Sequence, residues 1–282
     1  MSSKDHYPNC VIPLVCIDVD GTLVSKTGVV REPVWEAVDR ALARGQHLAL
    51  STARGAFASS WSMAQRLDPA GWHVFHAGGA TVHTKTQEAR GHALTDEQVA
   101  GCRTLSDEHG WVLELYSPTA YAVEDDSKPS VDHAALIGVP FVSTSLDSFI
   151  AAEASIVRAQ FVVPEEAISA VSEAAGALGL SMTSATSPIM PGTAFVTATK
   201  QGITKATGIA SICSELGVTM EQVMMIGDGL NDLAAMEAVG HPVAMGNAAP
   251  EVAAVARYHV AHVDNDGVAE ALDRSADIDP LS

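Results

Sequence analysis

Residues 11–22 read Val-Ile-Pro-Leu-Val-Cys-Ile-Asp-Val-Asp-Gly-Thr, an apolar run that ends in two carboxylates and a glycine. The length and β-branched content of this run predict a buried strand over residues 11–19. Asp18 and Asp20 are two residues apart, so both side chains point to one face if the backbone there is extended. Gly21 then permits the sharp turn that a site just beyond the strand requires.

Outward from this stretch, short apolar runs alternate with amphipathic ones. The helical spacing of residues 32–44 stops at Gly45, and Ser51-Thr52 is expected to open the next helix. The same alternation returns near the C-terminus. Together these patterns predict a parallel sheet with helices on both faces. The strands are predicted at residues 47–50, 74–76, 223–226 and 242–245, and the later helices at 204–216, 232–239 and 251–256.

The middle of the chain has a different order of elements. Helical patterns at residues 95–109 and 164–178 flank strand patterns at 111–116, 121–123 and 155–163, which fits antiparallel strands with helices on one face. We therefore predict a core domain of residues 1–82 and 192–282, interrupted by an inserted α/β domain of residues 83–191. The crossings are expected near Gly78–His83 and Pro191–Gly192.

Composition limits the classes of partner. The formal charge of −18 argues against a nucleic-acid backbone or an anionic membrane as the main partner. The same charge repels anionic substrates, so a phosphate site here requires a local cation or metal. No apolar run approaches the roughly 18–20 residues of a membrane helix. The polar start of the chain and four scattered cysteines indicate a cytoplasmic protein with reduced thiols. The oligomeric state is not indicated.

Polar clusters follow three of the predicted core strands, at residues 18–22, 51–54 and 227–232. Ligands of an open parallel sheet bind beyond the carboxyl ends of its strands, so these clusters are expected to converge. A single Asp after a strand is most often a helix cap or a turn residue. A whole set of carboxylates is different, because convergent carboxylates repel one another unless a cation lies among them. A few hard oxygen ligands favour Mg²⁺.

The residue types at these positions indicate a reaction. One of Asp18 and Asp20 can attack phosphorus, while the other donates a proton to the leaving oxygen and later accepts one from water. The phosphoryl group also requires a cation, and Lys205, at the start of a predicted helix, is the best candidate. A solvated surface lysine is the alternative, and the spacing does not exclude Lys200.

The motifs resemble those of the haloacid dehalogenase-like phosphatases. Asp-Val-Asp-Gly-Thr-Leu at residues 18–23 resembles their first motif, and Gly-Asp-Gly-Leu-Asn-Asp at 227–232 resembles the fourth. Thr-Ala-Arg at 52–54 and Gly-Ile-Thr-Lys at 202–205 resemble the second and third. Residues 243–248 and 266–269 are similar to the Cof-type branch, which has a large α/β cap. The resemblance covers nearly the whole chain.

The resemblance implies catalytic and metal-binding roles for four carboxylates. Asp18 would be the nucleophile and a Mg²⁺ ligand. Asp20 would be the general acid and base, with its backbone carbonyl on the metal. Asp228 would be the second carboxylate ligand, and Asp232 would hold the metal through water or support Lys205.

Three further residues would bind the phosphoryl group. Thr52 would donate a hydrogen bond to it, Lys205 would neutralise it, and Asn231 would contact it. The implied fold is a Rossmann-like parallel-sheet core with an inserted α/β cap that closes over the leaving group.

The implied activity is Mg²⁺-dependent hydrolysis of a small phosphorylated metabolite, of the sugar or glycerate phosphate type, through an aspartyl-phosphate. A phosphomutase or phosphotransferase on the same scaffold is one alternative. A non-enzymatic phosphate-binding module is the other.

Some residues differ from the family motifs, and the roles of some others are not decided by the sequence. Ala53 replaces the usual Gly and is acceptable if its φ is negative. Gly78 replaces an Asn and is expected to lose a side-chain hydrogen bond at the hinge. The pairs His73/His76 and His259/His262 are poorly spaced for a shared metal and are expected to be structural or surface residues. Arg158 either packs in the inserted domain or meets a second anionic group on the substrate.

Overall fold

The computed structural model describes residues 11–280. The chain folds into two compact units. The core unit holds the residues up to Ala53, Met63–Glu88 and the residues from Thr204 onward. The inserted unit holds Arg54–Ser62 and Ala89–Ile203. The expected fold class, a parallel-sheet core with an inserted α/β region, is confirmed.

The core unit is built on a five-stranded parallel sheet with β1 near its centre. All four residues of β1 are buried, because helices cover both faces of the sheet. In register, Ile17 of β1 lies opposite Ile226 of β11 and Leu50 of β2. The carboxyl ends of these three strands therefore lie side by side. The strand order is β13 (Tyr258–His259), β12 (His241–Ala244), β11 (Val223–Gly227), β1 (Leu14–Ile17), β2 (His47–Leu50).

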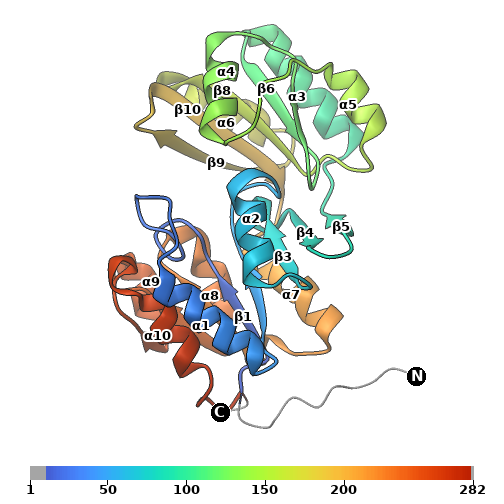
Figure 1. The fold of residues 1–282 in the computed structure, drawn as a ribbon. Helices are drawn as coiled ribbons and strands as arrows, with labels where there is room; N and C mark the ends of the chain where they lie inside the picture. Colours follow the sequence, from blue (N-terminus) through green and yellow to red (C-terminus); the bar gives the residue numbers. More distant parts are fainter. Residues whose placement is uncertain (1–10, 281–282) are drawn as a thin grey trace, which may run out of the picture. The chain divides into compact units, whose positions relative to one another are not determined.

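Two groups of helices cover this sheet. On one side, α1 (Glu32–Ala43) packs against α10 (Gly267–Arg274), and Figure 1 shows the two helices beside each other. A separate apolar cluster joins Leu14 and Cys16 of β1 to side chains of three other helices. Burying each large apolar side chain is worth about 1.5–3 kcal/mol, so this packing is what fixes β1. The three helices are α7 (Lys205–Leu216), α8 (Leu233–Ala238) and α9 (Pro250–Val255).

The side chain of His73 helps to join β3 (Trp72–Phe75) to the edge of the core sheet. Ser51 forms a parallel bridge with Val74, and Thr52 N–H donates to the Val74 carbonyl at 3.0 Å. One position earlier, Leu50 N–H donates to Nδ1 of His73 at 3.0 Å. The His73 ring is fully buried, and its Nε2–H donates to the Asp68 carbonyl at 3.1 Å. His73 is therefore structural, as the sequence predicted.

The helix expected at Ser51-Thr52 begins later. The structure starts α2 (Ala58–Leu67) at Ala58, so the prediction of a helix at residues 51–52 is wrong. The physical reason is that both residues are part of the β2–β3 connection. Thr52 donates to β3, and its carbonyl accepts from Ala77 N–H at 2.9 Å, so its backbone cannot enter a helix.

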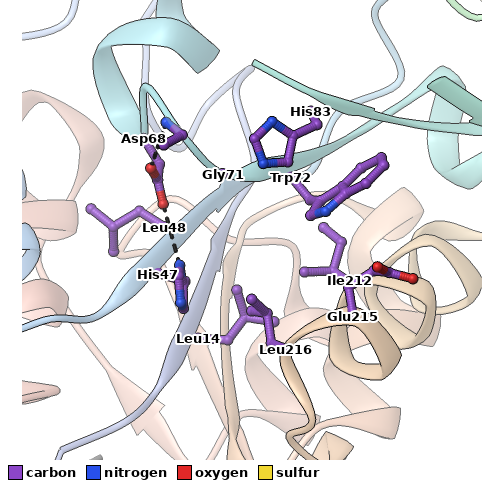
Figure 2. A pocket seen from close by; sticks show the side chains of 11 residues that line it. Leu14, His47, Leu48, Asp68, Gly71, Trp72, His83, Ile212, Glu215 and Leu216 are labelled. Atoms are coloured by element: carbon purple, nitrogen blue, oxygen red, sulfur yellow. Dashed lines mark hydrogen bonds and ion pairs between the residues drawn. The ribbon is translucent and has the colours of Figure 1, made fainter. Parts of the chain in front are cut away.

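A small cavity of about 130 Å³ lies at the amino ends of β1, β2 and β3, where Leu14, His47 and Trp72 line it. Figure 2 shows Asp68 and His47 facing one another there, with Asp68 Oδ2 3.6 Å from His47 Nδ1. This end of the sheet is opposite to the end that carries the polar clusters. The cavity and the catalytic candidates therefore belong to different ends of the same strands.

After β3, a 3₁₀ turn, η1 (His76–Gly78), leads into β4 (Ala80–His83), which pairs antiparallel with β3. Gly78 has a φ of +101°, and a Cβ there would lie 1.9 Å from the Thr204 carbonyl oxygen. The expectation of a lost side-chain hydrogen bond therefore does not describe this position. The backbone of Thr204 approaches so closely that no side chain fits.

The inserted unit contains an antiparallel sheet in the order β7, β6, β8, β10, β9. Its apolar core joins this sheet to helices α3, α5 and α6. This arrangement agrees with the predicted antiparallel strands covered by helices. The strands are β6 (Val112–Tyr116), β7 (Tyr121–Val123), β8 (Arg158–Pro164), β9 (Leu180–Ser187) and β10 (Met190–Lys200), with β5 (Ala89–Gly91) preceding them. The helices are α3 (Asp96–His109), α4 (Lys128–Leu136), α5 (Leu146–Ala152) and α6 (Ile168–Gly176).

A buried polar network lies on the other face of that sheet. The carboxylate of Glu114 is fully buried and contacts His133 Nδ1 at 2.7 Å, and it accepts from Tyr116 Oη at 2.6 Å. The guanidinium of Arg158 lies 4.5 Å from the centre of the Tyr116 ring and donates to Gln160. Arg158 therefore packs on an aromatic ring within this unit.

The second boundary of the inserted unit differs from the expected one. Pro191 and Gly192 lie inside β10, at a shift of register between Met190 and Ala194. A bulge of this kind uses the positive φ of Gly192, +78°, without ending the strand. The two units divide after Ile203.

The thiols of Cys16, Cys102 and Cys213 are buried and unpaired. Burial raises the pKa of Cys102 to about 12 and that of Cys213 to about 11, so neither thiolate is available as a nucleophile. Cys10 lies outside the described residues. Among the helices of residues 11–280, none combines the length and the apolar character that a membrane span needs.

The buried ring of His73 predicts a pH-dependent stability. Burial lowers the pKa of His73 from 6.5 to about 4. Between these values the unfolded chain binds a proton that the native chain does not, so the free energy of unfolding falls as the pH falls. The loss amounts to about 3 kcal/mol.

We expect H73Q to remove this contribution, because an amide can accept from Leu50 N–H and donate to the Asp68 carbonyl. Urea unfolding of both proteins between pH 7 and pH 4 measures the difference in free energy of unfolding. Parallel pH profiles for the two proteins would contradict the assignment.

Candidate active site

The carboxylates at the ends of β1 and β11 meet in the core unit. Asp18 N–H continues the ladder by donating to the Ile226 carbonyl at 3.0 Å, which brings Asp18 beside Asp228. Oxygen atoms of Asp18, Asp228 and Asp232 lie within 4.8 Å of one another. The parallel register therefore produces the convergence that the sequence predicted.

Lys205, the first residue of α7, supplies the cation. Its Nζ donates to Asp18 Oδ1 at 2.5 Å and to Asp232 Oδ1 at 2.6 Å, and the side chain is buried. Lys200 ends β10 in the inserted unit. Of the two lysines that the sequence left open, Lys205 is the one that contacts the buried carboxylates.

Asp232 is held on both oxygens. Its Oδ2 accepts from the backbone N–H groups of Asp228 and Gly229 at 3.1 and 3.0 Å, while its Oδ1 faces Lys205. Two roles were expected for Asp232, and this geometry fits the second of them, in which Asp232 holds Lys205 in place. It also fixes the turn that carries Asp228.

Electrostatics in the cluster are unbalanced, because one ammonium group faces two buried carboxylates. Burial raises the pKa of Asp18 to about 7. The nearby Lys205 opposes this rise and Asp232 adds to it. Burial also raises the pKa of Asp228, although Thr22 and Asn247 donate hydrogen bonds to it. The cluster is therefore short of positive charge.

Gly21 is required by the approach of Asp228. Its φ is +87°, and a Cβ there would lie 2.2 Å from Asp228 Oδ2. The next residue, Thr22, donates from Oγ1 to Asp228 Oδ1 at 2.8 Å. The run Asp-Gly-Thr at residues 20–22 thus turns the chain and holds the opposing carboxylate.

Asn247 is a site residue to which the sequence assigned no role. Its Nδ2 donates to the Gly21 carbonyl at 2.7 Å and to Asp228 Oδ2 at 3.1 Å. Its Oδ1 accepts from Val263 N–H at 3.0 Å. The stretch of residues 243–248 was the available signal, since it spans the end of β12, another strand of the same sheet.

The remaining predicted residues lie around the cluster. Asp20 is exposed beyond β1, Thr52 is buried at the end of β2, and Asn231 is exposed in the 3₁₀ turn η4 (Leu230–Asp232). Ala53 keeps a negative φ, so it meets the condition set for replacing glycine. Asp20 and Asn231 are accessible to a ligand, while Thr52 is held in place by its backbone contacts with Val74 and Ala77.

The donor set fits a divalent cation. Asp18 and Asp228 offer hard carboxylate oxygens close together, and burial raises the pKa of both, so a cation among them would stabilise their charged forms. A small number of carboxylate oxygens suits Mg²⁺, which keeps several waters in its coordination shell. The cluster is therefore a candidate metal centre.

The fold and the cluster define a class of α/β protein: carboxylates lie at the carboxyl edge of a parallel sheet, and a large insertion begins after Glu88. A family model described as haloacid dehalogenase-like hydrolase matches residues 15–272. The chain belongs to this family, so the expected family and enzyme class are confirmed.

Relatives agree with that assignment. The chain is similar to the Streptococcus pyogenes protein M6_Spy0533, named provisionally as a phosphatase, with 26% identity over 93% of this chain and 97% of the relative. A phosphoglycolate phosphatase of Methanothrix thermoacetophila is 41% identical over a stretch that covers 26% of this chain and 33% of that relative. The crystal structure of a haloacid dehalogenase-like hydrolase from Bacteroides thetaiotaomicron aligns with a TM-score of 0.78 and 25% identity, covering 93% and 98% of the two chains.

The raised pKa of Asp18 predicts that its ionised carboxylate lowers the free energy of unfolding of the metal-free protein. The native state favours a protonated Asp18, so this contribution to stability is lost as the pH rises from about 4 to about 7. An asparagine stays neutral throughout. In EDTA, we expect D18N to raise the melting temperature by about 5 °C at pH 8, and by less at pH 5.

Differential scanning calorimetry of the metal-free protein at both pH values tests this expectation. D126N, which changes an exposed carboxylate of the inserted unit, is the matched control. A melting temperature that D18N lowers equally at pH 5 and pH 8 would refute the electrostatic explanation.

Proposed function

We propose that this protein is a Mg²⁺-dependent phosphatase that hydrolyses a small phosphorylated metabolite, of the sugar or glycerate phosphate type, through an aspartyl-phosphate. The observation that carries the proposal is the position of Asp18. One of its oxygens lies 2.5 Å from a buried ammonium group, and the exposed Asp20 follows two residues later.

In the first step, a carboxylate oxygen of Asp18 attacks phosphorus and the bond from phosphorus to the ester oxygen breaks. Asp20 donates its proton to that departing oxygen, so the alcohol leaves neutral. In the second step, Asp20 accepts a proton from water as the water oxygen attacks the same phosphorus. The acyl-phosphate bond breaks, inorganic phosphate leaves, and Asp18 is restored as a carboxylate.

The surrounding residues stabilise charge during both steps. Lys205 faces the oxygens that gain negative charge, while Thr52 and Asn231 would donate hydrogen bonds to the phosphoryl group. Asp232 keeps Lys205 in place through its 2.6 Å contact. Because Asp232 is held by two backbone N–H groups and the backbone of Thr52 is hydrogen-bonded to Val74 and Ala77, these two residues need little rearrangement when the phosphate binds.

Mg²⁺ would be held by the carboxylates of Asp18 and Asp228 and by the backbone carbonyl of Asp20, with Asp232 acting through Lys205. When bound, the ion neutralises phosphoryl charge and supplies the positive charge that the cluster lacks. Thr22 and Asn247 orient Asp228 for this task through the contacts described above.

We also propose that the inserted unit is a cap that excludes bulk water from the reaction. The names of the relatives support phosphate-ester hydrolysis as the reaction. The name of the Methanothrix relative supports a small ester of the phosphoglycolate type.

The nucleophile is tested with p-nitrophenyl phosphate in the presence of Mg²⁺. We expect turnover by the wild type, loss of activity in EDTA, and a fall of at least about a thousandfold in kcat for D18N. Release of inorganic phosphate from glycerol 3-phosphate separates a hydrolase from a mutase. Comparable rates for D18N and the wild type would contradict the proposed intermediate.

Asp20 is tested by its two separate tasks. p-Nitrophenolate leaves without a proton, so the first step needs no acid, whereas the second step still needs the base. D20N should therefore release about one equivalent of nitrophenolate in a burst and then turn over slowly. Quenched-flow measurement detects the burst, and uniformly slow release with no burst would assign Asp20 another role.

A further inference from the structure

A groove of about 720 Å³ in the core unit begins at Asp20 and Asp228 and reaches Lys26 and His262. Asn247 forms part of the same lining. All of these residues belong to the core unit. The groove is therefore continuous with the proposed catalytic carboxylates, and a substrate bound at Asp18 can extend into it.

Polar contacts hold the walls of the groove together. Arg31 donates to both carboxylate oxygens of Asp266, at 2.6 and 3.2 Å, and to the Asp264 carbonyl at 2.6 Å. Asn247 joins Val263 on one wall to Gly21 at the base. The segment of residues 262–264 is thus fixed to Arg31 and to the turn after β1, to which Val24 is also joined through its carbonyl, which accepts from Gly21 N–H at 2.9 Å.

Lys26 is the cation of this groove. It is exposed, and among residues 11–280 no carboxylate lies within ion-pair distance of it. Several of the chain's other described cations have such a partner, as Arg40 has Asp273 and Arg66 has Asp39. In a chain with a formal charge of −18, an exposed ammonium without an ion pair is available to pair with an anion that enters this groove.

His262 offers a hydrogen-bond donor on the opposite wall. Its Nδ1 accepts from Asp264 N–H at 3.1 Å, so the ring proton of the neutral form is on Nε2. The Asp264 carboxylate lies 3.5 Å from the same Nδ1 and is largely exposed. Asp264 therefore opposes an anion in this groove, which provides a variant with an effect of opposite sign.

We propose that Lys26 and His262 bind a second negatively charged group, a carboxylate or a phosphate, on the leaving portion of the substrate. This inference rests on the proposed phosphatase function and narrows its substrate class to anionic phosphate esters. Lys26 forms the ion pair and His262 donates from Nε2. The reacting phosphate stays at Asp18 and Lys205.

The test uses substrates that differ only in the second group. 3-Phosphoglycerate carries a carboxylate where glycerol 3-phosphate carries a neutral alcohol, and glycerol 1,3-bisphosphate carries a second phosphate. 6-Phosphogluconate and sorbitol 6-phosphate repeat the first comparison over a longer chain. The wild type should have a lower KM for the anionic member of at least one pair, and the two second groups are ranked by the same measurement.

In K26A, the KM for the preferred anionic ester should rise about three- to fivefold relative to its neutral counterpart. H262A should shift this ratio in the same direction, and D264N in the opposite direction. K85A, which removes an exposed lysine elsewhere in the core unit, should leave the ratio unchanged. The shifts should decrease as salt is added.

An equal effect of K26A on both members of every pair, or no effect, would overturn the proposal. Failure of the phosphatase function would appear separately, as a wild type inert toward p-nitrophenyl phosphate. Calorimetric titration of D18N with 3-phosphoglycerate and glycerol 3-phosphate then decides the binding claim without turnover. Equal affinity for the two, or no binding of either, also rejects it.

Discussion

The site depends on one ammonium group shared between two buried carboxylates. Lys205 Nζ contacts Asp18 at 2.5 Å and Asp232 at 2.6 Å, in a place from which water is excluded. Removing charges from water is costly, and one cation cannot neutralise two anions. Burial raises the pKa of Asp18 to about 7, with Lys205 opposing the rise and Asp232 adding to it. The fold therefore holds its proposed nucleophile in a state that a divalent cation and a phosphate would complete.

Close backbone approaches turn this charge cluster into a defined geometry. Gly21 leaves room for Asp228, whose oxygens accept from Thr22 and Asn247. Asp232 accepts from the two N–H groups at the start of the same turn. None of these contacts supplies much stability alone, at about 1 kcal/mol for a typical hydrogen bond. Together they restrict the carboxylates to one arrangement, which lowers the reorganisation needed during the reaction.

Much of this was predictable because a parallel sheet turns sequence order into spatial order. The apolar runs of β1 and β11 and the polar residues after them were enough to bring Asp18 and Asp228 together in prediction. The failures have different physical causes. A helix was expected at Ser51-Thr52 because their side chains suit an N-cap, whereas their backbone groups are used by β3 and η1. Nothing in the sequence indicated that Glu114 is buried, since its partner His133 comes from another segment, α4. The bulge that lets β10 continue through Gly192 is likewise set by its partner strand.

The distribution of positive charge connects the site with its substrate. The chain has 16 basic and 34 acidic residues, so any anion approaches against a repulsive field. Ion pairs with Asp266, Asp273 and Asp39 occupy Arg31, Arg40 and Arg66 and cancel their field at long range. Lys205 is likewise neutralised at close range by its two carboxylates. Lys26 differs from these, because no carboxylate of residues 11–280 lies within ion-pair distance of it. In an acidic chain with this distribution, a second anionic group on a substrate is best met by a cation without an ion pair, and this lysine lies in the groove that Asp20 and Asp228 line.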